Sequence, residues 1–96
     1  MTELKLKSKY PEVIKPIIKS ALAERLTDIQ DGIKITETRI QAFEKKYQLS
    51  TEEFLQRFNN DELNHSFDFD EWIGKSRMLT HLYETQKAIE EFEFVN

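Results

Sequence analysis

Cysteine is absent from this sequence, so disulfides, thiol chemistry and cysteine-ligated zinc are excluded. Gly32 and Gly74 are the only glycines, which rules out the glycine-rich loops that bind phosphate in nucleotide enzymes. With only two prolines as well, the chain has too few turn formers for a β fold of many strands. The sequence also lacks a signal-peptide core and any run of about 18 apolar residues. We therefore expect a cytoplasmic protein that does not span a membrane.

Charged residues make up 33% of the sequence and hydrophobic residues 39%. This balance is too apolar for a disordered chain and too charged for a thickly layered globule, so it favours an elongated shape. Glu, Lys, Leu, Ile and Gln dominate, and most of these favour helix. The 96 residues fit one domain with a limited core. The composition predicts a single all-α domain.

The net charge of −4 is unevenly distributed along the chain. Residues 1–25 carry six basic and three acidic residues, whereas residues 51–96 carry four and eleven. The basic segment includes Lys5, Lys7, Lys9, Lys15 and Lys19. Nucleic-acid footprints are usually denser and interleaved with aromatic residues. Direct nucleic-acid binding is therefore not expected, and a nucleic-acid-associated regulator is the less favoured alternative.

A long helix is predicted over residues 16–48, preceded by an extended arm at residues 1–15. Proline is accepted in the first turn of a helix but damages its interior, so a start at Pro16 is favoured over a bent helix that starts at Pro11. From Leu22 onward, apolar residues recur at alternating steps of four and three, the spacing of a coiled-coil seam. This seam comprises Leu22, Leu26, Ile29, Ile33, Thr36, Ile40, Phe43 and Tyr47. A seam of this length requires a facing helix.

Two further helices are predicted, at residues 51–59 and 69–91. Ser50 and Glu53 have the spacing of a capping box, and Leu49 and Phe54 that of a hydrophobic staple, so a short helix should start at Thr51. The last helix has Asp68 or Asp70 as its N-cap. Its apolar face is wide enough to contact more than one neighbour and contains Trp72, Ile73, Ser76, Leu79, Leu82, Tyr83, Gln86 and Ile89.

Together these elements predict an antiparallel, coiled-coil-like hairpin whose first helix is longer than its last. The overhang should lie at residues 11–24 and should expose apolar side chains, the usual mark of a partner site. The candidate partner-binding residues are Ile14, Ile17, Ile18, Leu22, Phe92 and Phe94. Alternatively, the overhang packs on the C-terminal tail, residues 92–96. The alternating residues of the two termini either pair as short strands or fray.

No constellation for catalysis or metal binding emerges. His65 and His81 belong to no HExxH motif and have no second His one turn away. The acidic segment around His65 lacks the spacing of an EF-hand and is explained by a solvated loop followed by a helix cap. Ser50 is explained by capping, and Ser76 has no base nearby in the sequence. We predict a protein without enzymatic activity, cofactor or metal.

The segments KYQLSTEEFLQRF and FDFDEWIGKSRML resemble a family of small, helical, antitoxin-like proteins of prokaryotic toxin–antitoxin operons, those beside TumE-type toxins. The resemblance runs from about Tyr10 to Val95 and rests mainly on Phe43, Tyr47, Ser50, Phe54, Glu71 and Trp72. It implies a chain that binds and neutralises a co-encoded toxin and that forms a homodimer. The seam and the wide face of the last helix are the candidate dimer surfaces. The alternative is a structural coiled-coil protein that assembles only with itself.

Overall fold

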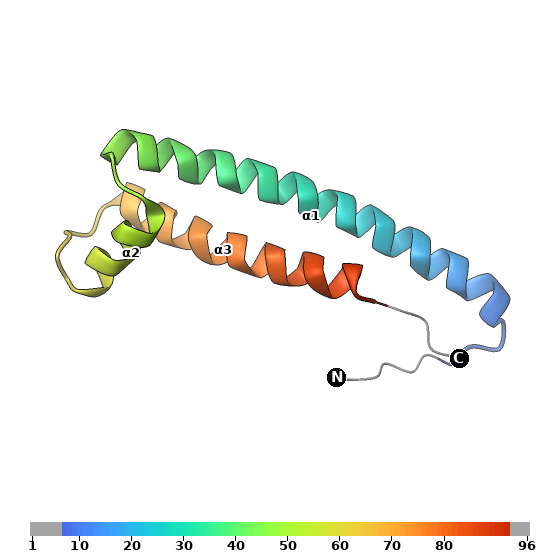
Figure 1. Cartoon of the computed structure of the whole chain (residues 1–96). Helices are drawn as coiled ribbons and strands as arrows, with labels where there is room; N and C mark the ends of the chain where they lie inside the picture. The colour runs from blue at the N-terminus through green and yellow to red at the C-terminus, as the bar shows by residue number, and fades with distance from the viewer. Residues whose placement is uncertain (1–6, 93–96) are drawn as a thin grey trace.

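The computed structural model describes residues 7–92. They form three helices, α1 (Pro11–Tyr47), α2 (Thr51–Asn59) and α3 (Phe67–Glu90), and within this range there is no strand. The molecule is elongated, with extents of 58 × 25 × 17 Å (Figure 1). The prediction of an all-helical chain with a long, a short and a long helix is confirmed. The predicted terminal strands fall largely on residues 1–6 and 93–96, outside the described range.

The start of α1 corrects the sequence prediction, because the helix begins at Pro11 and Pro16 lies inside it. The carbonyl oxygen of Tyr10 accepts hydrogen bonds from the N–H groups of Val13 and Ile14, both at 3.0 Å, which closes the first turn. Pro11 suits a first turn, and Pro16 removes only one intrahelical hydrogen bond. Residues 11–15 are therefore helical and not part of an extended arm. The helix ends at Tyr47, and Gln48 caps it in the left-handed conformation, with φ at 53°.

α2 spans the range that the sequence predicts, and the Ser50 side chain accepts a hydrogen bond from the Glu53 N–H at 3.1 Å. α3 begins two residues earlier than predicted. Its N-cap is Ser66, whose side chain accepts from the Phe69 N–H at 3.1 Å. The assignment of Asp68 or Asp70 as N-cap was wrong, because both lie in the first turn. Their negative charges are favourable there, near the positive end of the helix dipole.

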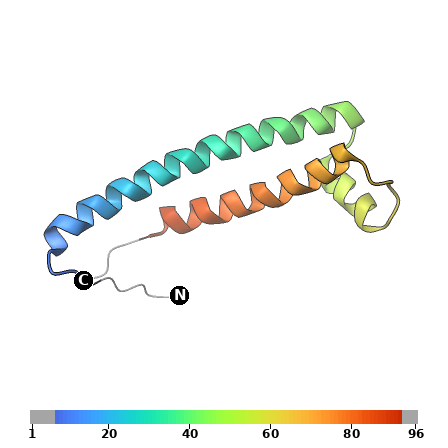
Figure 2. The same ribbon diagram turned by 180° about the vertical axis from the view of Figure 1, so that it is seen from behind.

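α1 and α3 lie side by side (Figures 1 and 2). Arg39 of α1 pairs with Glu71 of α3, and Gly32 lies near Leu82, so the paired residue numbers fall along α3 as they rise along α1. Extending this register places Glu90, the last residue of α3, beside roughly residue 24 of α1. The N-terminal turns of α1 thus continue past the end of α3, as Figure 1 shows.

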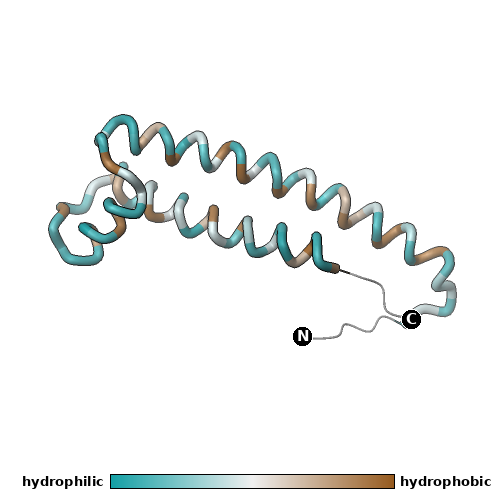
Figure 3. Tube along the Cα trace, viewed as in Figure 1, coloured by the Kyte–Doolittle hydropathy of each residue, from teal (hydrophilic) through white to brown (hydrophobic). Residues whose placement is uncertain are grey.

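The buried core has a broad end near α2 and a narrow part along the two long helices. At the broad end, Phe54 and Trp72 pack against Ile40 and Phe43. In the narrow part, the α1 seam residues Ile29, Ile33 and Thr36 are buried, whereas Leu26 and Leu82 are half-buried. Leu79 is also half-buried and packs against the broad end. Hydrophobic residues recur between hydrophilic ones along α1 (Figure 3). The seam is thus used inside the chain, so a second copy would need another surface.

Among residues 7–92, no helix combines the length and the apolar character needed to cross a membrane.

Candidate protein-binding surface

The three helices are fastened together by aromatic rings at the α2 end. The rings of Phe54 and Trp72 stack with centroids 3.9 Å apart, and Phe43 stacks on Trp72 at 5.6 Å. The indole Nε1–H of Trp72 donates to the Thr51 hydroxyl at 2.9 Å, and that hydroxyl donates to Glu44 at 2.9 Å. Each helix supplies one member of this chain of hydrogen bonds. Trp72 therefore has a structural role. Its ring is buried, and the hydrogen bond to Thr51 satisfies its one polar group.

Asp68 and Glu71, in the first turns of α3, are tied to α1 by charged hydrogen bonds. Asp68 accepts from Lys46 at 2.6 Å and from the Tyr47 hydroxyl at 2.5 Å. The Lys46 bond, followed by the Tyr47 bond, lowers the pKa of Asp68. Glu71 accepts two bonds from Arg39, at 2.5 and 2.9 Å, and these lower its pKa. Conversely, the bond to Asp68 raises the pKa of Tyr47.

These pKa shifts are those expected of groups held in ion pairs and hydrogen bonds between two helices. A general acid or base at neutral pH needs a carboxyl pKa raised toward 7 or a phenol pKa lowered toward it. Asp68 and Glu71 shift the other way. Tyr83, which donates to Glu37 at 2.5 Å, also has a raised pKa because of that bond. Asp68, Glu71 and Tyr83 of α3 thus each form a hydrogen bond that joins α3 to α1.

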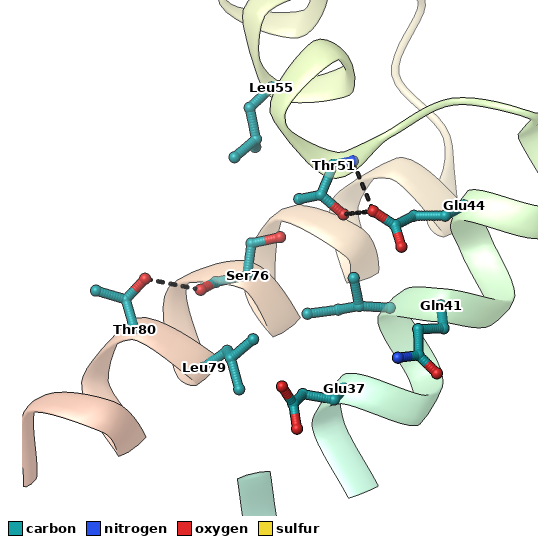
Figure 4. A pocket seen from close by; sticks show the side chains of 9 residues that line it. Glu37, Gln41, Glu44, Thr51, Leu55, Ser76, Leu79 and Thr80 are labelled. Atoms are coloured by element: carbon teal, nitrogen blue, oxygen red, sulfur yellow. Dashed lines mark hydrogen bonds between the residues drawn. The ribbon is translucent and has the colours of Figure 1, made fainter. Parts of the chain in front are cut away.

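A pocket of about 370 Å³ lies where the three helices meet (Figure 4). It is lined by Glu37, Ile40, Gln41, Glu44, Thr51, Leu55, Ser76, Leu79 and Thr80. Its hydroxyl groups are already engaged: Ser76 donates to the Trp72 carbonyl at 2.9 Å and Thr80 to the Ser76 carbonyl at 3.2 Å. Glu44 accepts from the backbone and side chain of Thr51. Among these hydroxyls, that of Thr51 is bonded to a carboxylate, and it also accepts from the Trp72 Nε1–H, so it forms part of the hydrogen bonds that join the three helices.

The acidic segment around His65 does not gather into a metal site in the described part of the chain. The His65 Nδ1 atom lies 3.7 Å from an Asp70 oxygen, and both side chains are exposed. The imidazole ring packs edge-on against Phe58, with centroids 5.0 Å apart. This arrangement matches a solvated loop that leads into α3.

Of the residues that the sequence predicted as partner-binding, only Ile17 is exposed among those that the structure describes. Ile17 is 55% exposed, and Val13, one turn before it, is 61% exposed. Ile14, Ile18 and Leu22 are half-buried. Phe92 is half-buried directly after α3, and Phe94 lies outside the described residues. The structure therefore brings four of the six candidates onto one helical segment.

Ile35 and Phe67 are among the exposed apolar residues that the sequence analysis did not identify. Ile35 is 70% exposed and lies between the seam positions Ile33 and Thr36 in the sequence. The one sequence signal for its exposure is that it does not belong to the four-and-three spacing of the seam. Phe67 is 95% exposed at the start of α3. The signal for Phe67 was Ser66, because a helix that starts one residue after this cap turns Phe67 away from the aromatic core.

The chain matches no protein-family model, no curated protein and no solved structure.

Proposed function

We propose that this chain is a non-enzymatic protein-interaction module, in which α1 and α3 form an antiparallel coiled-coil hairpin and the N-terminal extension of α1 binds a protein partner. One observation carries the proposal. The extension exposes Val13 and Ile17 on turns that α3 does not reach. A helix that presents large apolar side chains to water at one end is typical of a recognition surface.

The spacing of the extension suits insertion into a groove on the partner. Val13 and Ile17 are four residues apart, as are Ile14, Ile18 and Leu22. Residues at this spacing stack on one side of a helix, which is how amphipathic helices fill hydrophobic grooves. The binding energy would come from burying these side chains, at about 25 cal/mol per Å² of apolar surface.

The resemblance to antitoxin-like proteins makes a co-encoded toxin the first partner to test. In this proposal the chain neutralises the toxin by binding it, and no chemical step is required of the chain.

The test is co-expression of the tagged chain with the products of its neighbouring genes, followed by affinity capture. The test variant changes Val13 and Ile17 to Asp, and the matched control is Phe67→Asp, which also replaces an exposed apolar residue near a helix start. We expect a stoichiometric partner with the wild type and the control, and its loss with the test variant. A partner that is captured equally by all three chains would refute the role of the extension.

A further inference from the structure

α1 carries a second row of residues with the same alternating spacing as its buried seam. This outer row comprises Arg25, Asp28, Gly32, Ile35, Arg39 and Ala42. Residues at such spacing lie on one face of a helix. Apart from Gly32, which is half-buried, all of them are exposed. The row follows the edge of α1 where Arg39 meets Glu71 and Gly32 meets Leu82.

The outer row is self-complementary when it is reversed. If a second α1 helix runs antiparallel to the first and is centred on the midpoint between Gly32 and Ile35, Gly32 of each helix lies opposite Ile35 of the other. The same reversal places Asp28 opposite Arg39 and Arg25 opposite Ala42. We propose that this row is a homodimer interface, and that its occupant is the outer row of a second copy, with the two α1 helices antiparallel and related by a two-fold axis.

A close crossing of the two α1 helices explains why position 32 holds a glycine. A glycine inside a helix costs about 1 kcal/mol relative to alanine. Nothing among residues 7–92 requires it, because a Cβ atom at Gly32 would meet Leu82 at 3.6 Å, an ordinary van der Waals contact. In the dimer, Ile35 of each copy, 70% exposed in the single chain, packs over Gly32 of the other. The missing side chain lets the two backbones approach.

The charges along the row select the antiparallel arrangement. Asp28 is exposed and takes part in no ion pair among residues 7–92. Arg39 donates to Glu71 through Nε and Nη2, which leaves the N–H groups of Nη1 to bind a second carboxylate. In the dimer, Arg39 of each copy bridges its own Glu71 and Asp28 of the other. The reversed register also places Lys46 opposite Ala21, so no two like charges face each other.

This interface is separate from the proposed partner site and does not depend on it. Because the register places Lys46 of the second copy beside Ala21, the second α1 ends close to that point. Val13 and Ile17 lie beyond it and stay exposed in the dimer. The two partner-binding extensions would then point away from each other.

The test is sedimentation equilibrium of the full chain over about 1 μM to 1 mM, with thermal unfolding of each variant. We expect a wild-type dimer. Gly32→Ala should raise the dimer dissociation constant by about tenfold or more, because the added methyl group overpacks the crossing. The monomer of this variant should remain folded and should melt at a temperature no lower than that of the wild-type monomer. Asp28→Arg should weaken the dimer in the same way by facing Arg39 with a like charge.

Gly74→Ala is the matched control. Its added Cβ atom would have no neighbour within 4 Å, so it should leave dimerisation unchanged. Val13→Asp with Ile17→Asp should also leave the dimer intact, which separates this proposal from the partner site. A wild-type chain that stays monomeric at 1 mM (about 11.5 mg/ml), or a Gly32→Ala dimer as tight as the wild type, would overturn the proposal.

Discussion

At the scale of single residues, Trp72 is the side chain on which the broad end of the core depends. It is fully buried, it stacks on Phe54, and its N–H satisfies Thr51. Trp72→Phe should lower the free energy of unfolding by about 1–3 kcal/mol, because it removes both buried surface and a hydrogen bond. Urea denaturation measures this change. Combining it with Thr51→Val should give a loss smaller than the sum of the two single losses, since both variants break the same bond.

The carboxylates of Asp68 and Glu71 should make the free energy of unfolding depend on pH in the acid range. Their pKa values are lowered in the folded chain by Lys46 and Arg39 respectively. The unfolded chain therefore binds more protons in acid, so the stabilisation is present above the ordinary carboxyl range of about 4 and is lost as pH falls through the lowered pKa values. Melting temperature should decline more steeply from pH 5 to about pH 2 in the wild type than in a chain with Asp68→Asn and Glu71→Gln. Equal slopes in the two chains would contradict the ion-pair interpretation.

At the scale of elements, Thr36 is the polar member of the buried seam. It is buried, and its hydroxyl donates only weakly to the sulfur of Met78, at 3.7 Å. Thr36→Val should raise the free energy of unfolding by up to about 1 kcal/mol, because the apolar site no longer holds a poorly bonded hydroxyl. Thr38→Val is the control, since that hydroxyl is exposed and bonds to the Lys34 carbonyl. A loss of stability in Thr36→Val would show that the hydroxyl supports the pairing of α1 with α3.

The elements were predictable where local chemistry defines them. The seam spacing indicated a facing helix, and Ser50 as a predicted cap indicated the start of α2. The Glu53 carboxylate, which was expected to complete a capping box, accepts a hydrogen bond from Arg57. The helix starts at Pro11 and Phe67 were missed for a common reason. Packing elsewhere in the chain decides whether an interior proline is tolerated and which of several possible caps is used. The exposed extension followed from the difference in length between the two long helices. The exposure of Ile35 and Phe67 could not be predicted from the helix lengths, because it depends on the rotation of each helix about its own axis.

At the scale of the whole molecule, stability and recognition should belong to different parts of α1. Ile29 is buried against α3, whereas Ile17 lies on the extension and is mostly exposed. Ile29→Ala should lower the free energy of unfolding by about 2–4 kcal/mol, and Ile17→Ala by less than about 0.5 kcal/mol. The two variants delete the same atoms from the same helix, so chemical denaturation compares them directly. Similar losses would mean that the extension is part of the folding core.

The most direct test of the proposed function is site-specific photocrosslinking in cells that co-express the chain with the products of its neighbouring genes. A photoreactive phenylalanine is placed at Ile17 in one chain and at Phe67 in another. The account predicts one heterologous adduct from position 17, identified by mass spectrometry as a neighbouring gene product, and none from position 67. An adduct from position 67 alone, or no adduct with another protein from position 17, would contradict the role of the α1 extension in partner binding.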